Sequence, residues 1–154
     1  MDPRIPDLDS TLICEQWVKD LVDRKSNKMG EEQLRSVAPL LLFELLRYLK
    51  LKCVSKDGKV GPPSTEVDGM WHAYLLCTKE YFRFCETENK GAYLHHDPSL
   101  FGKGTETGKH AYHGCLALYT STFGEAPPKQ FWRRSAQGDA AVAQAWGSQS
   151  KEDP

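Results

Sequence analysis

A carboxylate and an imidazole four residues apart are the first pair whose types and spacing suit chemistry. Asp68 and His72 would lie one turn apart on the same face of a helix. A carboxylate next to an imidazole fixes its tautomer and raises its basicity, which suits a metal ligand or a general base. The same spacing is typical of surface ion pairs, and Lys79 and Arg83 lie nearby in the sequence. Spacing alone therefore leaves both interpretations open.

Two adjacent histidines, His95 and His96, follow in a segment rich in glycine and polar residues between positions 86 and 110. On an extended chain, neighbouring side chains point in opposite directions, so we expect one of the two to serve a given site. A loop of this length in a small domain is often functional. We therefore predict a metal site formed by His72 with one or both of these histidines, holding zinc or another divalent ion.

Two functions remain open for this cluster. With a bound metal that has open coordination positions, the protein would be a hydrolase or lyase acting on a small substrate, with Asp68 or Tyr81 as proton donor or acceptor. Without a metal and without any other cofactor, the histidines would be structural, and the protein would bind a partner protein or assemble into a complex. Cys85 and His113 are weaker candidates, because each is more typical of core or surface.

Hydrophobic periodicity predicts an all-α fold that positions these residues. We expect one compact domain of four to five helices over residues 1–135, arranged around a central buried helix, and a weakly structured tail over 136–154. Pro39 should kink or restart the second helix. The first predicted helix starts at Asp9 or Ser10. The other three run from Glu31 to about Leu51, from Ser64 to about Thr87, and from Thr107 to Phe123.

The third of these helices carries both Asp68 and His72, and its predicted core face lies within roughly 60° of one line. The residues of that face are Val67, Trp71, Tyr74, Thr78, Tyr81, Phe82 and Cys85. The sequence also allows a short β-hairpin that pairs Leu51–Val54 with Lys59–Val60. Its turn would lie in the stretch Ser55-Lys56-Asp57-Gly58-Lys59.

Net charge, apolar runs and cysteine count argue against several classes of protein. The chain has 154 residues, with 20 Lys and Arg against 21 Asp and Glu, so its formal net charge of -1 argues against a general nucleic-acid binder. We see no secretory leader and no apolar run long enough to cross a membrane. The five cysteines are scattered and odd in number, which favours a cytoplasmic protein with free thiols.

Three stretches of the sequence resemble a known family. Residues 63–85 contain Asp-x-x-Trp-His and then Thr-x-x-Tyr-x-x-Phe-Cys, and His-His-x-Pro and a closing Tyr and Phe-Gly follow in order. Together they resemble the glycine-rich domain-containing protein-like family, over roughly residues 60–132. The resemblance does not include the glycine-rich region. It implies that a set of residues belongs to one unit, namely Asp68, Trp71, His72, Tyr81, Cys85, His95 and His96.

Overall fold

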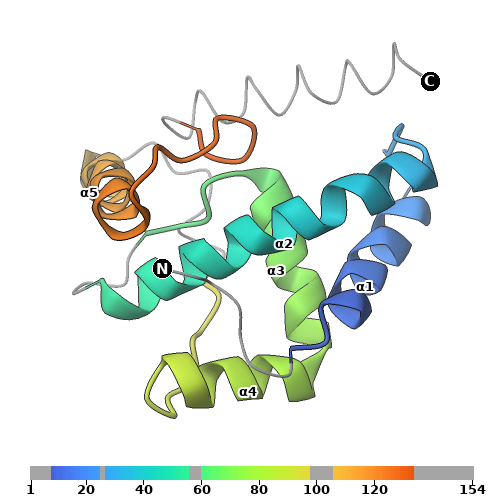
Figure 1. The fold of residues 1–154 in the computed structure, drawn as a ribbon, viewed down its shortest axis with the longest axis horizontal. Coiled ribbons are helices and arrows are strands. Elements are labelled where there is room, and N and C mark those ends of the chain that lie inside the picture. The colour runs from blue at the N-terminus through green and yellow to red at the C-terminus, as the bar shows by residue number, and fades with distance from the viewer. Residues whose placement is uncertain (1–7, 25–26, 56–59, 98–105, 134–154) are drawn as a thin grey trace.

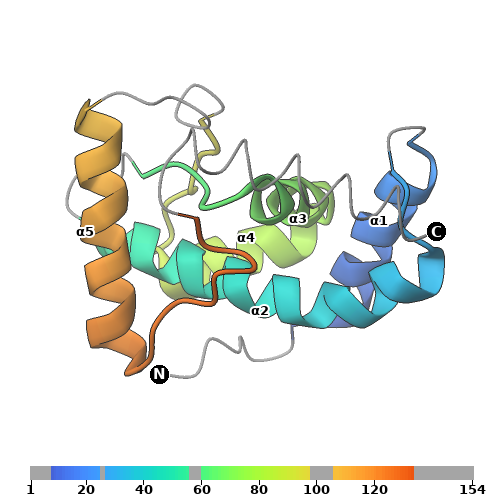
Figure 2. The same ribbon diagram turned by 90° about the horizontal axis from the view of Figure 1, so that it is seen from above.

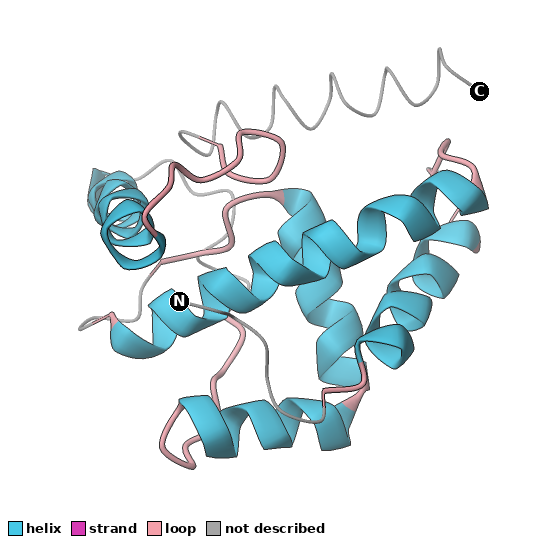
Figure 3. Cartoon of the chain, viewed as in Figure 1, coloured by secondary structure: helices cyan, strands magenta, loops and turns pink. Residues whose placement is uncertain are grey.

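The computed structural model describes residues 8–24, 27–55, 60–97 and 106–133. These residues form five α-helices and no strand, which confirms the predicted all-α class (Figure 3). The helices are α1 (Ser10–Val22), α2 (Glu31–Val54), α3 (Thr65–Leu76), α4 (Thr78–Glu88) and α5 (Glu106–Phe123). The predicted tail over 136–154 lies outside the described residues.

The long helix α2 is the centre of the arrangement. Helix α1 packs beside its N-terminal half, α5 lies across its C-terminal half, and α3 crosses it between them (Figures 1 and 2). Helix α4 packs against the end of α3. The core side chains of α2 are fully buried, but Leu40 is 60% exposed, so this helix has an open outer face that the sequence did not predict.

The ends of α1 and α2 follow local sequence signals, with one correction. Asp9 caps α1 by accepting a hydrogen bond from the Leu12 N–H at 3.0 Å, as expected for this residue type. Helix α2 continues through Pro39 and ends only at Val54. The predicted hairpin is therefore wrong at its first strand, because Leu51–Val54 is helical. In its second strand, Lys59 lies outside the described residues and Val60 belongs to no strand.

The predicted third helix is two helices, with the break at Cys77. The backbone of Cys77 leaves the helical region, and its carbonyl accepts the Tyr81 N–H at 3.0 Å to begin α4. The change of direction buries Tyr81, Phe84 and Cys85, but it leaves Phe82 exposed by 53% and Thr78 exposed. A single predicted core face across both helices is therefore wrong at these two positions.

A buried polar cluster joins α5 to α2. The Tyr119 hydroxyl donates to the carboxylate of Glu44 at 2.9 Å, and the indole N–H of Trp132 donates to the same group at 3.0 Å. The guanidinium of Arg47 lies over the Phe123 ring at 4.5 Å and donates to the Tyr119 hydroxyl at 2.6 Å. Helix α5 is therefore fixed to α2 by directional contacts as well as by apolar packing.

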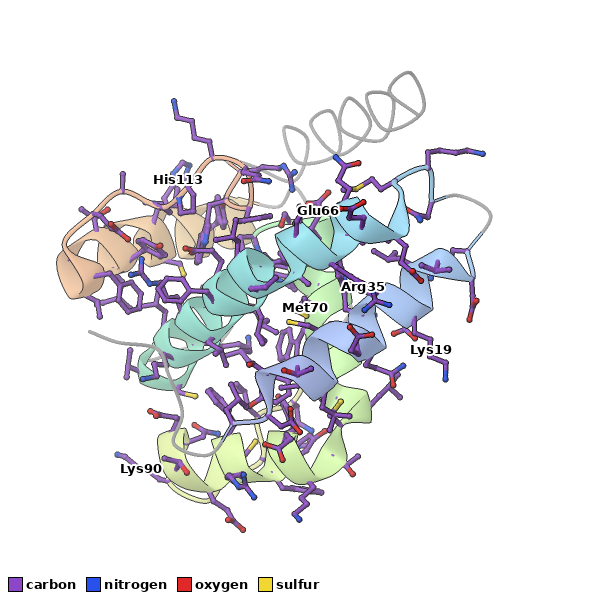
Figure 4. All side chains as sticks on the ribbon, turned by 45° about the vertical axis from the view of Figure 1, so that its right-hand side comes forward. Lys19, Arg35, Glu66, Met70, Lys90 and His113 are labelled. Carbon is purple, nitrogen blue, oxygen red and sulfur yellow. The ribbon has the colours of Figure 1, made fainter. Side chains whose placement is uncertain are left out.

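Residues 131–133 return the chain to the start of α3. Arg133 forms a buried ion pair with Glu66, and its backbone N–H donates to the Pro63 carbonyl. Figure 4 labels Glu66 in the first turn of α3 and Met70 one turn later, where Met70 is enclosed among the helices. The final described segment thereby holds the N-terminal half of α3, the helix that carries the predicted site.

Candidate metal centre

Helix α3 places two of the predicted site residues one turn apart. Ser64 caps this helix by accepting the Val67 N–H at 3.2 Å, and its side chain is fully buried. Val67 and Trp71 face the core, so Asp68 and His72 are carried on the neighbouring side of the same helix. This is the geometry that the four-residue spacing predicts.

The third site residue comes from the extended segment over residues 92–97, which follows α4. Lys90 and Gly91 both have positive φ angles, of 55° and 81°, and reverse the chain after the helix. Two side chains of α4 then bind the backbone of Leu94. Its N–H donates to the sulfur of Cys85 at 3.4 Å, and its carbonyl accepts the Tyr81 hydroxyl at 2.5 Å. His96 follows two residues later.

Asp68 lies between two imidazoles. One of its carboxylate oxygens is 2.6 Å from Nε2 of His96, and the other is 3.4 Å from Nε2 of His72. Within the described part of the chain, these three residues form the group whose donor atoms could hold a metal ion, all lying within 4.8 Å of one another. Two imidazoles and one carboxylate are ligands typical of zinc and of non-haem iron.

The two sides of this group differ in exposure. The side chains of His96 and Asp68 are only 10% and 16% exposed, whereas His72 is 49% exposed. The Trp71 ring stands edge-on to His96, with the ring centroids 4.4 Å apart, and closes the inner side. An ion held here would therefore face solvent on the side of His72 and the protein interior on the other.

The donor separations are close to those a metal requires. A tetrahedral ion with ligands at 2.0–2.2 Å keeps neighbouring donor atoms about 3.3 Å apart. The pair Asp68–His72 already has this separation. The pair Asp68–His96 involves the other carboxylate oxygen and is hydrogen-bonded at 2.6 Å, so it would have to open by roughly 0.7 Å for both atoms to bind one ion.

The remaining predicted candidates lie outside this group. His95 points away from it, with its ring 4.8 Å from the Tyr93 ring. Tyr81 is 1% exposed, and its hydroxyl is bonded to Leu94, while burial raises the pKa of this phenol and keeps it protonated. Burial also raises the pKa of the Cys85 thiol. His113 is exposed on α5, which packs on α2 rather than α3 (Figure 4).

Sequence reasoning missed how tightly Trp71 and Leu94 are tied to this site. The Trp71 indole N–H donates to the Tyr81 hydroxyl at 3.1 Å, so α3, α4 and the extended segment meet at one phenol. The alternation of side chains along residues 93–96 was the available signal, since it separates Tyr93 and His95 from Leu94 and His96. It could not indicate which pair turns inward.

Comparison with known proteins identifies a family. The family model described as UCP032817-like matches residues 10–125, from the start of α1 to the residues just after α5. The chain belongs to the UCP032817-like family. The match includes Asp68, His72 and His96, and the resemblance to the glycine-rich domain-containing protein-like family stays a prediction. No curated protein and no solved structure gives a significant match to the chain.

No helix within the described ranges combines the length and the apolar character needed to cross a bilayer.

Proposed function

We propose that this protein binds one divalent transition-metal ion through Asp68, His72 and His96. The observation that carries the proposal is the convergence of one carboxylate and two imidazole nitrogens, which lie within 4.8 Å of one another. Two of the three side chains are largely buried, so their orientations are set by packing before any ion arrives. Zinc is the ion we favour, because neutral imidazole and carboxylate are among its usual ligands.

Three protein ligands leave a tetrahedral ion one position for water or substrate, and such sites are catalytic more often than structural. We propose hydrolase or lyase chemistry on a small polar substrate. A zinc ion in such a site polarises a carbonyl and lowers the pKa of a bound water. Half-exposed His72 marks the side from which a substrate approaches, and Trp71 and His96 exclude water from the other side.

Asp68 has a second task in this proposal. As the carboxylate among the three ligands, it would offset half of the charge of a divalent ion. When no ion is bound, its carboxylate is hydrogen-bonded to His96 at 2.6 Å, and its other oxygen lies 3.4 Å from Nε2 of His72, so it helps to orient both rings. The three side chains would thus stay together both with and without the bound ion.

The test is elemental analysis of the purified protein after dialysis with zinc, together with cobalt absorption spectroscopy. We expect close to one ion per chain, with the visible spectrum of four-coordinate cobalt. His72→Ala, His96→Ala and Asp68→Asn should each lose the ion. His95→Ala and His113→Ala are matched controls that should keep it, since neither ring lies in the group.

A wild-type protein that takes up no metal after supplementation would refute the proposal. So would a His96→Ala variant that keeps a full complement of the ion. The alternative would then hold, in which Asp68 and the two histidines are a structural hydrogen-bonded group. The search would move to protein partners.

A further inference from the structure

We propose that Tyr81 is a positioning residue of the metal centre: its hydroxyl fixes the Leu94 carbonyl and thereby sets the place of His96. The phenol has no path to solvent, because Tyr81 is 1% exposed. Its role is therefore to hold the chain rather than to exchange protons with a substrate. The expected effect on zinc affinity rests on the proposed function, whereas the expected effect on the position of His96 does not.

The hydroxyl of Tyr81 is the shared atom of two hydrogen bonds. It accepts the Trp71 indole N–H at 3.1 Å and donates to the Leu94 carbonyl at 2.5 Å. Trp71 lies on the core side of α3 and directly precedes the ligand His72 in the sequence. One oxygen therefore connects the helix that supplies two ligands to the segment that supplies the third.

Leu94 is held on both of its backbone groups by α4. Besides the bond from Tyr81, its N–H donates to the Cys85 sulfur at 3.4 Å. Residues 92–97 belong to no helix or strand, so these two bonds take the place of a regular ladder. Because residues 94 and 96 point to the same side of an extended chain, fixing Leu94 also fixes the direction of His96.

Trp71 completes the arrangement from the other side. The edge of its ring meets the His96 imidazole at a centroid distance of 4.4 Å, while its N–H is engaged by Tyr81. The indole cannot rotate away without breaking that bond. His96 is thus placed by a backbone constraint through Tyr81 and by a packing constraint through Trp71, and both depend on the same hydroxyl.

The test is Tyr81→Phe, which removes the hydroxyl and keeps the ring. Groups that orient metal ligands typically contribute 10–100-fold in metal affinity. We expect a zinc dissociation constant raised on the order of tenfold, with the stoichiometry unchanged. Tyr74→Phe is the matched control, because Tyr74 is a buried tyrosine whose hydroxyl donates to the Glu80 carbonyl at 3.4 Å rather than to the segment that carries His96. It should leave the constant unchanged, whatever it does to the melting temperature.

A second measurement requires no metal. In metal-free protein, proton NMR should show Overhauser contacts between the Trp71 and His96 rings in the wild type and in Tyr74→Phe. These contacts should weaken or vanish in Tyr81→Phe. Retention of both the contacts and the wild-type zinc constant in Tyr81→Phe would overturn the inference. If the wild type binds no zinc but Tyr81→Phe shows this loss of contacts, the proposed function is refuted and the positioning role is supported.

If Tyr81→Phe does not fold, Cys85→Ala tests the same anchorage. It removes the acceptor of the Leu94 N–H and should weaken the same ring contacts to a smaller degree. Unchanged ring contacts in this variant would count against an anchored Leu94.

Discussion

Glu44 is the residue whose burial has the clearest energetic consequence outside the metal centre. It lies on the central helix with 6% exposure, and burial raises the pKa of its carboxyl. The hydrogen bonds from Tyr119 and Trp132 and the charge of Arg47 act in the opposite direction but do not cancel the effect. Folding therefore favours the protonated form of this group.

The upward direction of this pKa shift leads to a pH-dependent prediction for Glu44→Gln. A carboxyl with a raised folded pKa contributes stability that is fully present below its unfolded pKa and is lost as pH rises through the folded pKa. The wild type should therefore lose stability relative to Glu44→Gln as pH rises from about 4, the usual pKa of a glutamate, through the raised pKa of the folded state. Urea unfolding of both proteins across this range measures the difference. A difference that stays constant with pH would contradict the assignment, and Glu86→Gln on the surface controls for the change in net charge.

The end of α5 shows how one residue terminates an element. Gly124 has a φ angle of 75°, and its N–H donates to the Thr120 carbonyl at 2.9 Å to close the last turn. This backbone region is open to glycine and strained for other residues. Gly114, in the interior of the same helix, has no such requirement, and an added Cβ would meet nothing within 4 Å at either position.

The same substitution should accordingly have opposite effects at these two glycines. Gly124→Ala should reduce the free energy of unfolding by about 1–2 kcal/mol, because the left-handed conformation is strained for alanine. Gly114→Ala should raise it by about 0.5–1 kcal/mol, because alanine loses less entropy in a helix. Chemical unfolding of the pair measures both. Equal shifts of the same sign would show that the end of α5 does not depend on the conformation of Gly124.

The helices and their connections also show which features of the fold could be predicted from the sequence and which could not. The start of α1 next to Asp9 and the end of α5 at Phe123 were predicted correctly, because capping is a local effect. The break at Cys77 was missed, since residues 76–78 contain neither glycine nor proline. The Asp68–His72 pair was predictable from its spacing within one helix. The tie from Tyr81 to Leu94 was not, because it exists only when α4 turns back beneath α3.

On the scale of the whole molecule, residues 131–133 join parts of the chain that are distant in sequence. Trp132 is 4% exposed, packs on Tyr48 and Tyr119, and donates its N–H to Glu44. The adjacent Arg133 pairs with Glu66 at the start of α3. The segment therefore connects α2, α3 and α5 after the end of α5.

Removing Trp132 should weaken the entire fold. Trp132→Ala should cost about 3–5 kcal/mol of unfolding free energy, as is usual for a large buried aromatic side chain. Trp132→Phe keeps most of the packing but leaves Glu44 without one donor, and should cost about 1–3 kcal/mol. Lys129→Ala, an exposed neighbour, should change the unfolding free energy by less than about 0.5 kcal/mol. A Trp132→Ala protein as stable as Lys129→Ala would contradict this role.

The contact between Trp71 and His96 has an optical consequence. Indole is the principal ultraviolet fluorophore of proteins, and this one touches the ring that we assign to the metal. Its emission should respond when His96 changes its bonding partner. The ring of Trp132, by contrast, packs on Tyr48 and Tyr119. Metal binding at this site could then be followed by the intrinsic fluorescence of the protein, without an added dye.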